Sequence, residues 1–385
     1  MLLKGITLPH SSLNQSAKRY RVASINLFNF IEPPAAFYDF ENIYTQAQWQ
    51  GKLAWFSDWV TSANPDMIGF QEVFSPQALA AWAKDNGYPH FAVIDEPTLV
   101  NDYTYKNPVV AFASRFPITD FGEVGIDKDA CELMGLSRDF GFSRKPLRAT
   151  VELPEFGALD CYVIHFKSKR NQLDDNLEYR SSMTGAAEFV AKQVLGKWGA
   201  SLQRGSEATA LYYAMLARRF ESTNPYVLMG DFNDKLASDL FSAFRQSQRI
   251  FRSDISDANL AKQSDTELKA SLQQFAVFDS YELHFQGARC NKTLAQDEFE
   301  TSLDELNQLE SHSASQRSAT HYYGNVGSVL DYILVSSEFN PAALQNLAQV
   351  VDYQTFDRHL IKPDYERDKD STDHAPVMMT FELRR

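Results

Sequence analysis

Two polar side chains follow a short apolar run near the middle of the sequence. Residues 226–229 read YVLM, Gly230 follows, and Asp231 and Asn233 come next, two positions apart. On an extended chain such a pair faces one side, so both groups could address one ligand. Asp and Asn after a strand also commonly form a turn that bonds its own backbone, and this segment alone favours that simpler interpretation. The rest of the chain must decide between the two.

Carboxylate, amide and imidazole groups recur beside other apolar runs. They stand at Asn26 after VASI, Glu72 after MIGFQ, His165 after CYVI, Asp331 within VLDYILV, and Asp373–His374 before APVMMTF. A single polar residue at a strand end usually forms a turn or a cap. Polar residues at six strand ends are hard to explain in that way. Ligands of layered α/β sheets gather where strand ends open into loops. We therefore interpret these residues as one site.

Metal-assisted hydrolysis of a phosphoester is the chemistry that this set favours. Glu72 and Asp373 are hard oxygen ligands and Asn26 offers a neutral one, which suits Mg²⁺ with waters and a substrate phosphate. His374 could activate a water near neutral pH if a carboxylate such as Asp331 fixes its tautomer.

Three further residues could donate hydrogen bonds to phosphoryl oxygens as negative charge builds, namely His165, Asn233 and Lys167. A Ser-His-Asp hydrolase is a poor alternative, because neighbouring residues cannot readily form its line of groups and no GxSxG turn is present. A zinc hydrolase is also disfavoured, since the eight histidines include no HExxH pair.

Apolar and β-branched runs predict the strands that position these groups. They lie at 21–27, 67–70, 91–94, 109–113, 148–153, 159–165, 226–229, 329–335 and 376–382. Helical spacing predicts a helix over 46–60, a second that begins at Ser75–Pro76 and stops near Gly87, and a third over 206–220. This alternation indicates a layered α/β fold. Residues 254–320 are polar and weakly periodic, which indicates a variable, partly helical insertion.

The ordered motifs resemble the endonuclease/exonuclease/phosphatase superfamily of deoxyribonuclease I-like phosphoesterases. They are INLFNF, IGFQEVF, VVAFASRFPI, VIHFKSKR, LMGDFND, VLDYILVS and STDHAP, and they span about residues 20–383. The resemblance implies a four-layered α/β sandwich, with two mainly antiparallel β-sheets packed face to face and flanked by helices. It implies one catalytic domain over 19–385 with the insertion at about 254–320, and an N-terminal extension over 1–18.

The resemblance also implies roles for the residues. Glu72 would be the main metal carboxylate, and Asn26 and Asp373 would complete the metal site. His374 would be the general base or would orient the water, held by Asp331.

On the substrate side, the resemblance implies that Asp231 aligns the nucleophile or protonates the leaving oxygen. Asn233 and His165 would contact the scissile phosphate. Arg204 could reach a second phosphate, although a charge pair at a helix start is the simpler interpretation. With the ordered motifs in view, we expect Asp231 and Asn233 to serve one phosphate rather than a turn alone.

The charge and composition of the chain limit the kinds of partner that it is expected to bind. The net charge of −13 disfavours tight non-specific binding along nucleic acid, although basic runs at 143–148 and 166–170 could line a local cleft. Three scattered cysteines and the lack of a long apolar run predict a soluble cytoplasmic protein without a membrane contact. Nothing indicates an obligate protein partner.

We therefore expect an Mg²⁺-dependent phosphodiesterase of nuclease type, with Mn²⁺ as an alternative ion. Its candidate substrates include DNA and RNA, because the HFKSKR segment resembles bacterial nuclease-like members. The alternatives are a phosphatase acting on a small metabolite or lipid headgroup, and a phosphate-binding relative without turnover.

Overall fold

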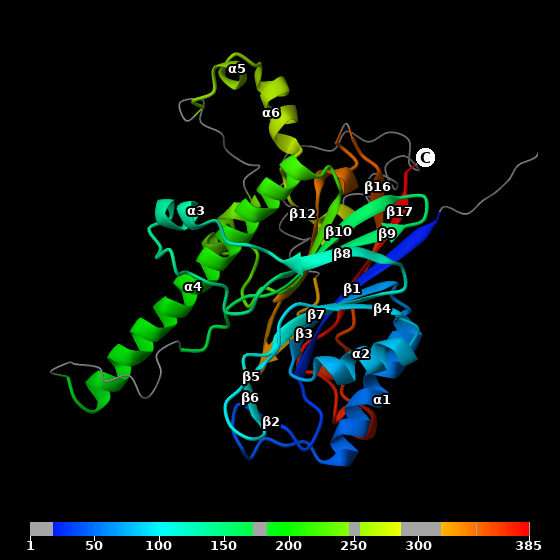
Figure 1. Cartoon of the computed structure of the whole chain (residues 1–385), viewed down its shortest axis with the longest axis vertical. Coiled ribbons are helices and arrows are strands. Elements are labelled where there is room, and N and C mark those ends of the chain that lie inside the picture. The colour runs from blue at the N-terminus through cyan, green and yellow to red at the C-terminus, as the bar shows by residue number, and fades with distance from the viewer. Residues whose placement is uncertain (1–17, 172–182, 246–254, 286–316, 344, 385) are drawn as a thin grey trace, which may run out of the picture.

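Two six-stranded sheets form the centre of the molecule in this computed structural model (Figure 1). The structure describes residues 18–171, 183–245, 255–285, 317–343 and 345–384. The first sheet has the order β16 (Ala348–Thr355), β17 (Val377–Leu383), β1 (Arg19–Phe30), β3 (Met67–Val73), β7 (Val109–Ser114) and β4 (His90–Val93). The second has the order β12 (Phe278–Asp279), β15 (Asp331–Val335), β11 (Tyr226–Asp231), β10 (Gly157–His165), β9 (Leu147–Leu153) and β8 (Ile118–Glu123).

Both sheets are mainly antiparallel, and each contains one parallel pair. The parallel pairs are β1 with β3 and β10 with β11. The carboxyl ends of parallel strands meet at one edge of a sheet. Polar residues that follow β1 and β3, or β10 and β11, are therefore brought together in pairs.

The main core lies between the two sheets. Alternate side chains serve different layers: on β1, Val22 packs between the sheets, whereas Ala23 and Ile25 pack toward the helices. The sheets approach closely at Gly69, where an added Cβ would lie 2.8 Å from Met229 Sδ. Only glycine fits at that contact without displacement of the opposite sheet.

Helices cover the outer face of each sheet. α1 (Gln46–Ala63) and α2 (Pro76–Asp85) pack on the first sheet, and the second sheet is covered by α4 (Ala186–Glu221) with η1 (Asp239–Arg245). The expected four-layered α/β sandwich is confirmed. None of the helices within the described ranges is both long and apolar enough to cross a membrane.

Smaller elements complete the described chain. A three-stranded sheet joins β2 (Ala36–Phe37), β6 (Thr104–Lys106) and β5 (Thr98–Leu99), and a hairpin pairs β13 (His321–Tyr323) with β14 (Val326–Ser328). The short helices are α3 (Lys128–Leu133), α5 (Ala258–Ala261), α6 (Asp265–Gln273), η3 (Ser337–Phe339), α9 (Arg358–Ile361) and α10 (Tyr365–Asp368).

Each predicted strand is present, with shifted boundaries. The sequence did not predict β8 and β16, which are edge strands of the two main sheets, or the short strands β2, β5, β6, β12, β13 and β14. The helix predicted over 206–220 begins twenty residues earlier, as α4 over Ala186–Glu221. Within the predicted insertion, α5 and α6 are helical and β12 pairs with β15, so part of this segment joins the second sheet. Residues 286–316 and the predicted extension up to residue 17 lie outside the described ranges, and the domain boundaries stay predictions.

Candidate active site

Backbone bulges position Glu72 on β3 and the segment that follows Asn26 on β1. The register of β1 against β3 shifts between Asn26 and Phe30, and that of β3 against β7 shifts between Phe70 and Val73. Both strands therefore continue past the ends that the sequence predicted. Asn29 and Glu72 have left-handed φ values of 57° and 59°, and the Asn29 N–H donates to Glu72 Oε2 at 3.0 Å. Bulges commonly redirect side chains at functional edges, as these two do.

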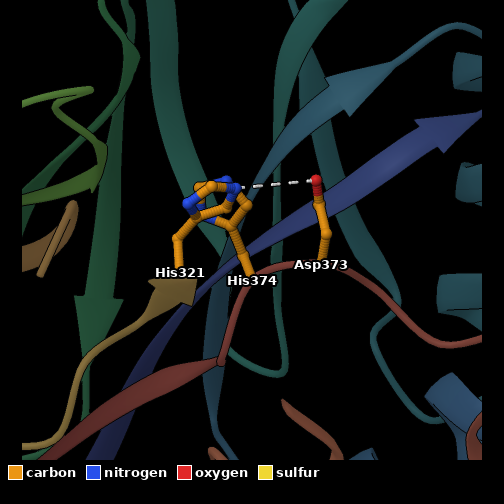
Figure 2. A group of neighbouring side chains, drawn as sticks. All are labelled: His321, Asp373 and His374. Atoms are coloured by element: carbon orange, nitrogen blue, oxygen red, sulfur yellow. Dashed lines mark ion pairs between the residues drawn. The ribbon is translucent and has the colours of Figure 1, made fainter. Parts of the chain in front are cut away.

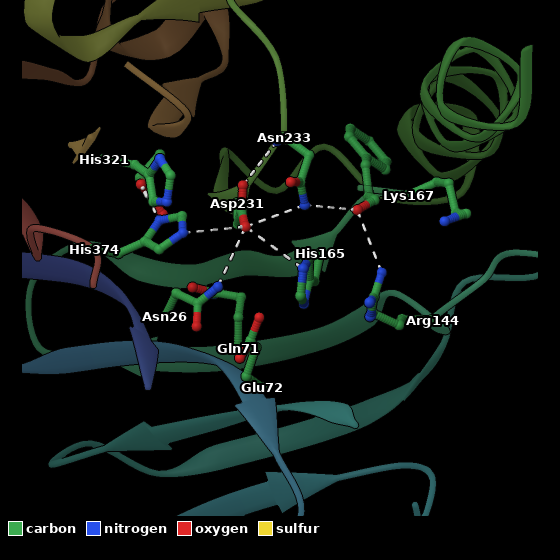
Figure 3. Close-up of polar contacts among 12 residues, drawn as sticks. Asn26, Gln71, Glu72, Arg144, His165, Lys167, Asp231, Asn233, His321 and His374 are labelled. Carbon is green, nitrogen blue, oxygen red and sulfur yellow. Dashed lines mark hydrogen bonds and ion pairs between the residues drawn. The ribbon is translucent and has the colours of Figure 1, made fainter. Parts of the chain in front are cut away.

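The second sheet contributes three site residues in one row. In the strand register, His165 lies opposite Asp231, and Asp231 lies opposite Asp331. His374 reaches this row from the loop before β17. Its Nδ1 lies 2.8 Å from Asp331 Oδ2 and its Nε2 lies 3.9 Å from Asp231 Oδ2 (Figure 3). The four residues are buried.

Asp231 is the central group of the cluster. Its Oδ2 accepts hydrogen bonds from Asn26 Nδ2 at 3.2 Å and Asn233 Nδ2 at 3.1 Å, and it lies 3.5 Å from His165 Nε2. Figure 3 shows these groups converging on the carboxylate from both sheets. These contacts, together with those of His374, join six of the predicted site residues, while Glu72 and Asp373, both within the described ranges, form no hydrogen bond with Asp231.

Asp231 and Asn233 meet through a turn, and not because the chain is extended. Asn233 has a φ of 56°, and its N–H donates to Asp231 Oδ1 at 2.7 Å. The backbone-bonded turn is therefore present, but the same carboxylate also belongs to the cluster. Both N–H bonds of the Asn233 side chain are engaged, since Nδ2 donates to Asp231 Oδ2 and to the Phe166 carbonyl at 3.0 Å.

The titratable groups of the cluster have pKa values that are shifted in different directions. Burial raises the pKa of Asp231 to about 7, although the charge of His374 opposes the rise. Burial alone would lower the pKa of His374, but the charges of Asp331 and Asp231 hold it well above the usual value. Burial and then the charge of Arg144 hold the pKa of His165 well below its usual range, so that ring is neutral. Shifted pKa values of this kind are typical of functional sites.

Two groups in the described ranges bring three metal-ligating atoms within 4.8 Å of one another. One is His321, Asp373 and His374, and the other is Asp231, Asp331 and His374. Figure 2 shows the first, in which His321 Nε2 lies 4.0 Å from Asp373 Oδ2. Glu72 belongs to neither group. Burial raises the pKa of Asp373, and the negative charge of Glu72 adds to the rise.

Sequence reasoning missed two residues that support the site. His321, on β13, lies against His374 with ring centroids 4.8 Å apart, and Lys52 on α1 donates to the carbonyls of Leu27 and Phe28 at 3.0 and 3.1 Å. Lys52 thereby holds the bulge that follows Asn26. His321 stands one residue beyond the segment interpreted as an insertion, and Lys52 falls inside a helical pattern, so neither position signalled a role.

Two predicted substrate-binding residues lie apart from the cluster. The side chain of Lys167 points away from Asp231 in Figure 3, and its pKa is lowered by burial and by the nearby charge of Arg144. Arg204 is only 2% exposed, inside α4 and not at a helix start. Its guanidinium donates to the Lys167 carbonyl and to Asp234.

The fold and the cluster together define a class of protein: an α/β sandwich with a buried histidine–carboxylate site at one edge of its two sheets. The sequence profile of the Endonuclease/Exonuclease/phosphatase family matches residues 25–374. The chain therefore belongs to this family of phosphoester hydrolases, whose members generally use divalent metal ions.

Solved structures agree on the fold. The catalytic domain of human Nocturnin, with a bound sulfate anion, is 14% identical over 95% of both chains, with a TM-score of 0.50. ANGEL2, described as a 2′,3′-cyclic phosphatase, is 12% identical over 95% of both chains, with a TM-score of 0.50. At these identities the likeness establishes the fold alone. Comparison with curated protein sequences gives no match.

Proposed function

We propose that this protein is a divalent-metal-dependent phosphodiesterase of nuclease type, with DNA and RNA as candidate substrates. The observation that carries the proposal is the position of the His374 ring, whose two nitrogens face the buried carboxylates of Asp331 and Asp231. This arrangement orients one imidazole toward the place where a water and a phosphate would meet.

The oxygen-bearing residues on β1, on β3 and in the loop before β17 suit Mg²⁺, with Mn²⁺ as the alternative. Glu72, Asp373 and Asn26 offer the hard oxygen atoms that these ions prefer. Burial and then the charge of Glu72 raise the pKa of Asp373, and a cation held by these carboxylates would stabilise their charged forms. When bound, such an ion would neutralise the negative charge that develops on the phosphoryl oxygens.

His374 is the proposed base. Its Nδ1–H donates to Asp331 Oδ2, which leaves Nε2 free to accept a proton from the attacking water. A cation held by Glu72 and Asp373 would offset the charge of Asp373, which contributes to the raised pKa of His374. The neutral imidazole that a base requires would then be favoured.

Asp231, His165 and Asn233 are the proposed contacts of the reacting phosphate. The raised pKa of Asp231, about 7, allows a protonated carboxyl to donate to the leaving oxygen. The neutral His165 donates through Nε2. Asn233 contributes by exchanging its bond to Asp231 for one to a phosphoryl oxygen, because both of its side-chain N–H bonds are otherwise engaged.

Turnover of bis-p-nitrophenyl phosphate and p-nitrophenyl phosphate, measured side by side, tests the proposal. Each substrate is assayed with Mg²⁺, with Mn²⁺ and with chelator, using wild type, Glu72→Gln and the control Glu96→Gln at an exposed position. We expect metal-dependent cleavage of the diester that only Glu72→Gln loses. Preference for the monoester would instead support the phosphatase alternative. Absence of cleavage of both, followed by absence of cleavage of DNA and RNA, would overturn the proposed nuclease-type activity, and phospholipid substrates would then test the phosphatase alternative.

A further inference from the structure

One buried carboxylate on α4 joins two backbone segments beside the site. Glu207 is 1% exposed, and its Oε1 accepts hydrogen bonds from the Ser143 N–H at 2.7 Å and from Gln203 Nε2 at 3.0 Å. Its Oε2 accepts the Lys167 N–H at 2.8 Å. The Ser143 hydroxyl also donates to Oε1, and within the described ranges no cation forms a direct ion pair with Glu207. Its charge is therefore compensated at contact distance by N–H and O–H donors, while Arg204 and Lys167 act on it from further away. Burial of a carboxylate that has hydrogen bonds but no direct ion pair costs free energy unless every donor stays in place.

Arg204 lies one turn earlier on the same helix. Its Nη1 donates to the Lys167 carbonyl at 3.0 Å, and its Nη2 lies 3.4 Å from Asp234 Oδ2. Asp234 also pairs with Lys169 at 2.6 Å. Residue 167 is thus held by α4 at both of its backbone groups, the N–H by Glu207 and the C=O by Arg204.

The segments held in this way are those that carry the proposed phosphate contacts. Residue 167 follows His165 and Phe166 at the end of β10, and Asp234 follows Asn233 after β11. The Phe166 carbonyl accepts from Asn233 Nδ2 at 3.0 Å, so the two turns already touch. A shift of either turn would therefore move His165 or Asn233 relative to Asp231.

We propose that Arg204 and Glu207 are positioning residues for the proposed hydrolysis, acting through the turns after β10 and β11. The inference rests on the proposed function and assigns Arg204 a role different from direct phosphate binding, because its guanidinium is buried and engaged by the protein. α4 therefore holds the turns after β10 and β11, which carry the proposed phosphate contacts, in fixed positions. Supporting shells of this kind decide how accurately a site is held.

Kinetics of two conservative variants test the inference. Glu207→Gln keeps the side-chain shape but replaces one acceptor oxygen by a donor, and Arg204→Lys removes the planar fork. The matched control is Arg219→Lys, which alters another Arg–carboxylate pair on α4, that of Arg219 with Glu338. With bis-p-nitrophenyl phosphate, we expect kcat to fall about 10- to 100-fold in both test variants while KM changes little. We expect Arg219→Lys to keep wild-type kcat.

Melting temperatures separate positioning from general loss of structure. The inference stands if the test variants lose kcat at a temperature well below their melting points, with a loss of stability no greater than that of Arg219→Lys. It is wrong if kcat is unchanged, or if all three variants lose activity in proportion to their loss of stability.

Amide hydrogen exchange provides a readout that does not depend on turnover. The Lys167 N–H donates directly to Glu207, so its exchange rate measures how firmly α4 holds this turn. We expect faster exchange at residues 166–169 and 233–236 in Glu207→Gln but not in Arg219→Lys. If wild type cleaves no phosphoester but this exchange pattern is seen, the proposed function is wrong and the structural role of Glu207 stands. Unchanged exchange in Glu207→Gln would show that Glu207 does not hold these turns.

Discussion

The contact between His374 and Asp331 is the most specific feature at the scale of single residues. Asp331 is 1% exposed, and its backbone N–H donates to Thr320 Oγ1 at 3.1 Å. Thr320 therefore anchors the backbone of Asp331, whose Oδ2 lies 2.8 Å from His374 Nδ1. The carboxylate selects the tautomer in which Nε2 faces Asp231 and the proposed water. Loss of this selection is expected to affect turnover more than metal binding.

Asp331→Asn tests that expectation. An amide at this position can direct its NH₂ group toward Nδ1, which favours the opposite tautomer, and kcat should fall by about 10³- to 10⁴-fold. The Mn²⁺ dissociation constant measured by calorimetry should stay close to that of wild type. Asp352→Asn is the control with an equal change of charge. A weakened Mn²⁺ affinity with normal turnover at saturating Mn²⁺ would place Asp331 among the metal ligands instead.

At the scale of elements, α4 has two different halves. Its buried residues begin at Gly196 and continue through Arg204, Glu207 and Met215. Large apolar side chains of the first half are exposed, including Phe189 at 64%, Val194 at 62% and Trp198 at 60%. Figure 1 shows this half extending away from the sheets. Helices gain most of their stability from packing, so the two halves should differ in local stability.

Hydrogen exchange along α4 measures this difference. We expect amides in residues 187–195 to exchange about 100-fold or more faster than those in 207–215, because opening the first half exposes little buried surface. The measurement is made at several protein concentrations. Equal protection of both halves at every concentration would show that the first half is packed in solution, and protection that rises with concentration would show that self-association covers it.

Arg317 joins β12 and β16 at the edge of the molecule where the predicted insertion returns. Its guanidinium forms an ion pair with Asp279, donates to the Tyr353 hydroxyl at 2.7 Å, and lies 4.7–5.1 Å from the ring centres of Tyr281, Tyr332 and Tyr353. The side chains of the ion pair are 8% and 9% exposed. Removal of the cation therefore leaves a buried, unpaired carboxylate.

Arg317→Met should lower the free energy of unfolding by about 3–5 kcal/mol, as for other buried pairs that lose one partner. Urea titration followed by circular dichroism measures the change. The control is Arg138→Met, whose ion pairs with Asp129 and Glu132 are at least half exposed, and which should cost less than about 1 kcal/mol. Equal losses in the two variants would contradict the importance of burial at Arg317.

At the scale of the whole molecule, buried histidines link stability to pH. His359 is 6% exposed, lies against Trp55 with ring centres 4.9 Å apart, and burial holds its pKa below the usual value. Below about pH 6.5 the unfolded chain binds a proton at this residue that the folded protein resists. Its contribution to stability is therefore complete above that pH and is lost as the pH falls.

His359→Gln should flatten the loss of stability between about pH 6.5 and pH 5, because the unfolded state then gains one proton fewer. Melting temperatures of wild type and variant across this range measure the slope, with His90→Gln, at a half-buried strand position, as control. A parallel slope in wild type and His359→Gln would show that this residue does not contribute to the acid sensitivity.

The sequence by itself determined nine of the strands and the layered class, because apolar runs and turn residues report local burial, and its ordered motifs indicated the family. It missed β8 and β16, edge strands that are partly exposed and give no continuous apolar run. It also identified the polar groups at strand ends, and six of them meet in one cluster: Asn26, His165, Asp231, Asn233, Asp331 and His374. The ordered motifs carried this information because each spans one strand and the loop beside it.

Only the tertiary structure decided how those groups meet. The row from His165 to Asp331 depends on strand register, and Glu72 depends on a bulge with a left-handed backbone. The supporting contacts of His321, Lys52 and Glu207 join residues far apart in the chain. Local periodicity cannot specify such contacts, because the register of a strand and the partner of a buried polar group are set by the packing free energy of the whole sandwich.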